Sequence, residues 1–274
     1  MTRRARRLQT AAIVPAAAAA AERPAPPNDP YYGEQWALRS EATNGIDLLE
    51  TWRFGQGSGV VVAVLDTGIT THQEFDGRLL PGYDFISDTV RAGDGDGRDS
   101  DPSDPGDWVS TTDISAQTYG PNCTETSDSS WHGTHVAGTI LAAANNGVGV
   151  AGIAPLAQLL PVRVIGHCGG SVTDLIDAMR WAGGLSIPGV PENPTPATII
   201  NISLVVERSC SAAMQAAVDE LSARGVVIVT AVGNESLDAS RFAPANCFGT
   251  LTVGATTLAG DRASYSNYGS AVDL

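Results

Sequence analysis

The sequence has few basic residues for its acidity, no long apolar run and no closely paired cysteines. Sixteen Lys and Arg stand against 30 Asp and Glu, which gives a formal net charge of −14. This balance argues against a nucleic-acid partner, because phosphate-binding surfaces need clustered Lys and Arg. No apolar run approaches the roughly 20 residues that a membrane-spanning helix needs. The four cysteines lack Cys-x-x-Cys spacing, which argues against zinc and thioredoxin-type redox chemistry.

What remains is the composition of an ordinary globular protein. The chain has 274 residues, of which 43% are hydrophobic and 17% charged, and 30 glycines suit a fold with many tight loops. This length allows one large α/β domain or two small ones. The surplus of aspartate favours solubility outside the cell and cation sites. We therefore expect a secreted protein, most simply a monomer.

The N-terminal segment differs from the rest of the chain. Four arginines between positions 3 and 7 precede an Ala-rich run over 11–21, which has the outline of a signal peptide. A remnant of a longer pro-segment is the alternative, since alanine is weakly hydrophobic and Pro15 interrupts the run. The Pro-rich stretch 22–27 is typical of an exposed linker. We expect residues 1–27 to be this signal-like or pro-segment remnant with its linker, and 28–274 to be the folded domain.

Strand and helix patterns alternate along this domain. The sequence predicts strands over 59–65, 158–165, 197–204, 226–232 and 251–256, with helices over 134–144, 172–182 and 212–224. Strands joined by single helices form right-handed βαβ units. The expected fold class is therefore α/β, with a mostly parallel central sheet and helices on both faces. Ligands of such sheets bind outside the carboxyl ends of the strands.

Two polar motifs meet at that edge of the predicted sheet. Asp66 ends the apolar run Val-Ala-Val-Leu-Asp-Thr-Gly, and His132 opens the helical segment His-Gly-Thr-His-Val-Ala-Gly-Thr. Alone, Asp66 is explained by a turn-capping role and His132 by its place at a helix start. Together the motifs resemble the subtilisin-like serine proteases (subtilases, peptidase family S8), whose triad runs Asp, His, Ser. The resemblance implies that Asp66 orients the imidazole and that His132 is the general base and acid.

The same resemblance assigns Asn234, in Ala-Val-Gly-Asn-Glu-Ser, to the oxyanion. The family's serine lies in a Gly-Thr-Ser-Met-Ala segment that these 274 residues do not contain. We therefore expect a serine endopeptidase domain that is incomplete at its C-terminus, inactive as it stands and left with an apolar face exposed. Two alternatives stay open: a non-catalytic pseudo-protease that binds peptides, and a calcium-dependent extracellular structural domain.

Substrate contacts are expected after the third predicted strand. Ser203, Leu204 and Val205 resemble the segment that pairs with an extended peptide in the family, and the expected partners are a peptide or protein substrate and the protein's own pro-domain. The family places two glycines after the leucine, whereas this chain has Val205 and Val206. Because glycine serves where backbone approaches a ligand closely, two β-branched residues are expected to narrow the cleft or shift the strand.

Two groups of oxygen-bearing side chains are candidate calcium sites, and Ca²⁺ is the one cofactor we expect. The first is the Asp-rich stretch 94–107, with the candidate ligands Asp94, Asp96, Asp99 and Asp101. The second follows from the resemblance and comprises Asp29, Glu74 and Asn146. A merely solvated acidic loop is the alternative for the first group, and helix termination at 145–147 for part of the second.

The four cysteines allow three disulfide pairings. In the predicted fold, Cys210 and Cys247 follow adjacent parallel strands, while Cys123 precedes the His132 helix and Cys168 follows a strand at the same edge. We therefore expect Cys123–Cys168 and Cys210–Cys247, with free buried thiols as the alternative. Disulfides would indicate an oxidising compartment. The remaining histidines give no functional signal: His135 reads as a structural residue, and His72 and His167 as surface or loop positions.

Overall fold

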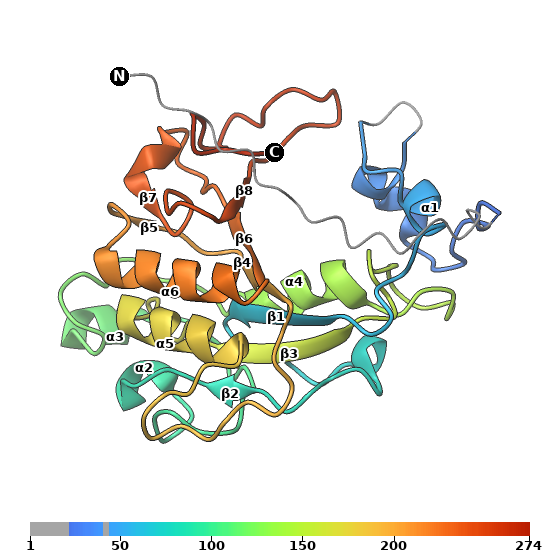
Figure 1. Ribbon diagram of the computed structural model, residues 1–274. Coiled ribbons are helices and arrows are strands. Elements are labelled where there is room, and N and C mark those ends of the chain that lie inside the picture. The colour runs from blue at the N-terminus through green and yellow to red at the C-terminus, as the bar shows by residue number, and fades with distance from the viewer. Residues whose placement is uncertain (1–21, 41–43) are drawn as a thin grey trace.

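The computed structural model describes residues 22–40 and 44–274 (Figure 1). The predicted signal-like segment falls almost entirely on residues 1–21, outside this range. In the described part, six parallel strands form one sheet in the order β2-β3-β1-β4-β6-β8. Their bounds are β1 Val61–Asp66, β2 Tyr83–Asp84, β3 Gln158–Arg163, β4 Ile199–Ile202, β6 Val227–Ala231 and β8 Leu251–Val253. An antiparallel pair, β5 Val206–Glu207 and β7 Phe242–Ala243, lies apart from this sheet.

Helices cover both faces of the sheet, which confirms the predicted fold class. The α-helices are α1 Leu48–Thr51, α2 Thr89–Ala92, α3 Thr111–Ala116, α4 His132–Leu141, α5 Val172–Ala182 and α6 Ala212–Ala223. Short 3-10 helices are η1 Tyr32–Glu34, η2 Trp36–Leu38, η3 Gln73–Phe75 and η4 Ala239–Arg241. The main core packs α5 and α6 against one face, and a smaller cluster packs α4 against the other. No helix in the described ranges is long and apolar enough to cross a bilayer.

Local sequence explains where the long helices begin. Ser171 caps α5, its hydroxyl accepting the Thr173 and Asp174 amides, and Ser211 caps α6 by accepting the Met214 amide. The prediction for α5 is correct at both ends. The prediction of 134–144 for α4 is wrong at both ends, because the helix starts at His132 and Ala142 leaves helical geometry with ψ of 144°.

Both expected disulfides are formed, Cys123–Cys168 and Cys210–Cys247, with Cα atoms 5.9 and 5.2 Å apart. The reasoning for the second pair needs correction. Cys210 and Cys247 follow β5 and β7, which are antiparallel partners, and not adjacent strands of the parallel sheet. The antiparallel pairing brings the two following segments together equally well.

Within residues 22–40 and 44–274, helices pack on only one face of the half of the sheet formed by β4, β6 and β8. Val64 packs among α4 residues, whereas its neighbours Ala63 and Leu65 pack among residues of α5 and α6. The strand register places seven side chains on the α4 side of the next three strands, here called the open face: Ile199, Asn201, Val227, Val229, Ala231, Leu251 and Val253. All seven are half-buried or exposed, whereas Ile200, Ile202, Ile228, Thr230 and Thr252 on the other side are at most 1% exposed. The open face is largely apolar, and such a surface favours association.

Adjacent residues of β6 test this asymmetry, since Val227 is 48% exposed and Ile228 only 1%. In the 274-residue chain, Val227→Thr should change the free energy of unfolding by less than about 0.5 kcal/mol and lower both dye binding and self-association. Ile228→Thr should cost about 2 kcal/mol or more, because it leaves a cavity and buries a hydroxyl. Urea unfolding, binding of a hydrophobic dye and sedimentation velocity measure these effects. Equal losses of stability in both variants would show that the open face is covered.

Candidate active site

The centre of the candidate site is a hydrogen-bonded pair of side chains at the carboxyl end of β1. Asp66, the last residue of β1, is fully buried, and its Oδ1 and Oδ2 lie 2.7 and 2.9 Å from Nδ1 of His132. The imidazole stands at the start of α4 with its side chain 43% exposed. With Nδ1 toward the carboxylate, the Nε2 edge faces away from it, and no described residue hydrogen-bonds to Nε2. The pair therefore presents a base toward solvent.

A second set of hydrogen bonds fixes the end of β1 and the start of α4 to each other. The Gly133 amide donates to the Thr67 hydroxyl over 3.0 Å, and this hydroxyl donates to Asp104 over 2.6 Å. The Thr67 amide in turn donates to Asp66 over 2.8 Å. Thr67 and Asp104 are buried, so each of these groups needs its partner. Sequence reasoning placed Asp104 in the acidic stretch and missed this role.

Glycine at position 133 is required by the approach of α4 to β1. A Cβ atom there would lie 2.3 Å from the Gly68 carbonyl oxygen and 3.1 Å from the Asp66 Cβ. Any larger residue would therefore push the helix away from the strand. This close contact sets the short distance between His132 and Asp66.

The electrostatic surroundings favour the protonated imidazole. The hydrogen bond with Asp66 is the largest influence and raises the pKa of His132 above its usual value. Partial burial opposes the rise, while the charges of Asp66 and Asp107 add to it. Asp107 lies close because its carboxylate accepts the Ser130 amide and hydroxyl, over 2.6 and 2.8 Å. The acidic stretch thus contributes directly to the charge around the base.

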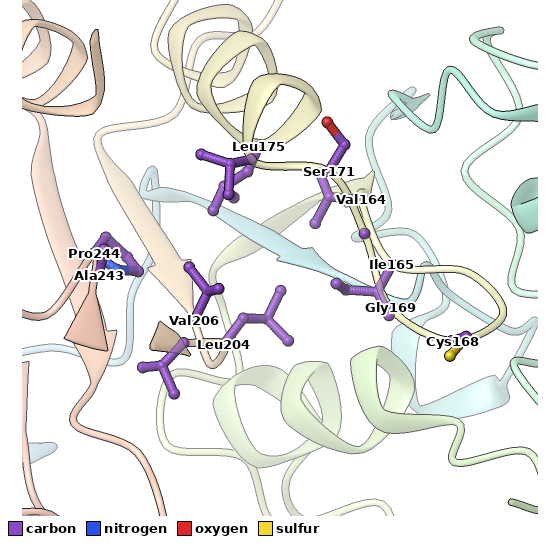
Figure 2. A pocket seen from close by; sticks show the side chains of 13 residues that line it. Val164, Ile165, Cys168, Gly169, Ser171, Leu175, Leu204, Val206, Ala243 and Pro244 are labelled. Carbon is purple, nitrogen blue, oxygen red and sulfur yellow. The ribbon is translucent and has the colours of Figure 1, made fainter. Parts of the chain in front are cut away.

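Other predicted site residues lie on neighbouring strand ends. Asn234 follows β6 and is exposed. Ser203 follows β4 and its hydroxyl accepts from Asn201, over 3.0 Å. Leu204 and Val205 line an apolar pocket of about 280 Å³ with Val206, and its other walls come from the loop between β3 and α5, from α5 and from the cis Ala243–Pro244 segment (Figure 2). Val206 lies in the wall of this pocket because β5 pairs with β7 and places Val206 opposite Ala243. The sequence did not predict this pairing.

The two candidate cation sites differ in how they are built. Carboxylate oxygens of Asp94, Asp96 and Asp99 lie within 4.8 Å of one another, and Asp101 does not belong to this group. At the second site, Asp29 accepts the Asn145 and Asn146 amides, while the Asn146 side chain donates to Glu74 over 3.2 Å. Asp29 and Glu74 are buried, and neither forms an ion pair with a described residue. Buried carboxylate oxygens are donors that suit a hard cation.

His167 lies in the loop after β3, one of the two positions predicted for it, but this loop position is buried. Its ring stacks on Tyr119 at 5.0 Å and meets Trp108 edge-on at 4.6 Å. Its Nδ1 lies 2.6 Å from the Trp108 carbonyl oxygen. Together with Cys123–Cys168, these contacts fasten the loop before α4 to the end of β3. The aromatic residues around position 167 come from distant segments, so local sequence gave no signal of them.

A parallel α/β sheet that carries a carboxylate-bound imidazole at its carboxyl edge is the arrangement that the sequence motifs led us to expect of a subtilase domain. Comparison with known sequences agrees: the profile of the Subtilase family matches residues 57–274, and the chain belongs to that family.

Relatives of this chain are secreted proteases by name. It is 47% identical over 249 residues to "Extracellular protease" of Xanthomonas campestris pv. campestris, covering 90% of this chain and 42% of that protein. It is 48% identical over 251 residues to "Extracellular basic protease" of Dichelobacter nodosus, covering 91% and 41%. The chain therefore spans about two fifths of the length of these curated relatives. A solved structure of proteases from Pseudoalteromonas arctica superposes with a TM-score of 0.86 at 46% identity, covering 91% of this chain and 71% of that one.

The raised pKa of His132 sets the sign of a pH effect on stability. The contribution of the Asp66 pair is fully present below the unfolded histidine pKa, about 6.5, and is lost as pH rises through the higher folded value. The unfolding free-energy difference between wild type and His132→Gln should therefore be greatest in mild acid and shrink toward alkaline pH. His135→Gln, on the same helix, is the control and should leave the pH profile unchanged. Urea unfolding at several pH values tests this, and a difference that grows with pH would contradict it.

Proposed function

We propose that the chain forms most of the catalytic domain of a secreted serine endopeptidase. The observation that carries the proposal is the hydrogen bond of 2.7 Å between His132 Nδ1 and the buried Asp66, with the Nε2 edge exposed. Membership of the subtilase family and the protease names of its relatives support the same reading. The two disulfides are consistent with an oxidising, extracellular setting.

In this proposal the reaction proceeds by acyl transfer. His132 Nε2 takes the proton of a serine hydroxyl as that oxygen attacks the peptide carbonyl, and later returns it to the leaving amine. Asp66 keeps the Nδ1–H tautomer and stabilises the imidazolium. The Asn234 amide donates to the oxyanion that forms on the carbonyl oxygen. The 274 residues contain no Gly-Thr-Ser-Met-Ala segment, which carries the nucleophilic serine in the family. We therefore expect the chain by itself to have no peptidase activity.

The substrate in this proposal is an extended peptide. The pocket beside Leu204, Val205 and Val206 is lined by aliphatic side chains and backbone, and it has room for one aliphatic or aromatic side chain. The β-branched residues add apolar contact area at the wall, so we infer a preference for an apolar substrate residue there.

Activity and covalent labelling test the function. A form of the protein that includes the nucleophile segment should hydrolyse peptides and react with a fluorophosphonate, and His132→Ala should abolish both. Asn234→Ala should lower kcat by about 10²- to 10³-fold with little change in KM, a magnitude that comes from subtilisin itself. Asn122→Ala, at an exposed position like that of Asn234, is the control for loss of an amide. Absence of labelling together with retained peptide binding would favour a non-catalytic peptide-binding module instead.

We also propose that Ca²⁺ stabilises the fold at the Asp29, Glu74 and Asn146 site, and that the acidic loop holds a second ion through Asp94, Asp96 and Asp99. The first site joins the N-terminal segment to the loop after α4 through buried, anionic oxygens. A bound cation would offset the electrostatic cost of burying these carboxylates.

Removal of calcium should therefore lower the melting temperature. Glu74→Gln should reduce the calcium-dependent part of the melting temperature, and Asp96→Asn combined with Asp99→Asn should remove the smaller contribution of the exposed loop. Asp219→Asn, an exposed carboxylate on α6, is the control. Thermal unfolding with Ca²⁺ or a chelator gives the comparison, and equal calcium dependence in all variants would refute both sites.

A further inference from the structure

Trp131, the residue before His132, has an unusual backbone conformation. Its φ of 50° and ψ of 30° lie in the left-handed region, which disfavours large side chains. Six other non-glycine residues in the described part of the chain have positive φ, and all are polar or small: Asn44, Asp47, Gln117, Asn145, Cys168 and Ser236. A glycine or asparagine would adopt this geometry at lower cost. The indole must therefore contribute something that offsets the strain.

Aromatic pairing and side-chain hydrogen bonding among the described residues do not supply this contribution. Trp131 is 43% exposed. Its indole makes no contact with another aromatic ring and no side-chain hydrogen bond within residues 22–40 and 44–274. Trp108 is a useful contrast, because it is 44% exposed yet packs edge-on against His167. A partly exposed indole without such a partner is available to a ligand.

Hydrogen bonds hold the backbone on both sides of Trp131. Before it, Asp107 accepts both the amide and the hydroxyl of Ser130, and Val109 pairs with Ser127. After it, the imidazole of His132 is held by Asp66. The backbone that carries the indole is therefore held one residue from the His132 imidazole, where a peptide would come to react in the proposed function.

We propose that Trp131 is a specificity-determining residue, whose indole packs against an apolar side chain of the peptide substrate next to the scissile bond. This inference rests on the proposed peptidase function. Tryptophan suits the role because it offers a large, rigid apolar face with few torsions to immobilise. The free-energy cost of the left-handed backbone is borne in the free protein, and the benefit appears when substrate covers the ring.

The test compares peptides that carry Phe or Gly on either side of the scissile bond, using the protein with its nucleophile segment. At one of these positions, Trp131→Gly should lower the Phe-to-Gly ratio of kcat/KM by about tenfold, the size of a good aromatic contact. Trp131→Asn should behave like Trp131→Gly, and Trp131→Phe should retain most of the ratio. Phe248→Ser removes an exposed aromatic residue far along the chain and is the control for general surface effects.

Stability and binding separate the remaining explanations. Because glycine relieves the backbone strain, Trp131→Gly should keep or raise the melting temperature. An unchanged ratio, or a lower melting temperature with all peptides affected equally, would show that Trp131 is structural and overturn the proposal. The affinities of the 274-residue chain for the Phe and Gly peptides give the same comparison by binding, without hydrolysis. A Trp131-dependent preference in binding, with no hydrolysis or labelling of the longer protein, would support the Trp131 proposal and refute the peptidase function.

Discussion

The arrangement of the site depends on one fully buried arginine. Arg163 is the last residue of β3, is 0% exposed and pairs in register with Asp66 on β1. A guanidinium removed from water must be paired, because its desolvation is otherwise prohibitive. It donates to Asp84 on β2 and to Asp94 of the acidic loop, each over 2.5 Å, and to the carbonyl of Ala92. Strand, loop and short helix are thus joined beside Asp66, the residue that holds the His132 imidazole.

This anchor changes how the acidic stretch is understood. A solvated acidic loop would leave its carboxylates in water, but several of these carboxylates have assigned partners. Asp94 pairs with Arg163, Asp104 accepts from Thr67, and Asp107 accepts from Ser130. Asp96 and Asp99 remain with Asp94 as the cluster that suits a cation. The hydrogen-bonded carboxylates of the stretch are therefore directed at β3, at the end of β1 and at the start of α4.

The sequence alone predicted the helices and strands that show a clear hydrophobic pattern, and the site residues that lie in recognisable motifs. The long strands and helices, the Cys123–Cys168 pairing and the nearness of Asp66 to His132 follow from apolar runs, topology and motif order. The Cys210–Cys247 pairing was predicted correctly but from the wrong strands, since β5 and β7 were not foreseen. The two-residue strands β2, β5 and β7 were not predictable, because they are too short to show a period and depend on partners far along the chain. Arg163 was detectable in principle, since a lone charge inside the apolar run 158–165 indicates a buried pair. Its partners were not, because Asp84 and Asp94 come from other segments.

The open face links stability to chemistry. On the closed side of β6, Ile228 and Thr230 are buried beneath the helices, whereas Val227, Val229 and Ala231 on the other side are not. Asn234 follows the same strand by three residues, so the proposed oxyanion donor comes directly after a strand whose outer side belongs to the open face. The pair of His132 and Asp66 is organised instead by β1, by the start of α4 and by Arg163 on β3, in the half of the sheet away from β8.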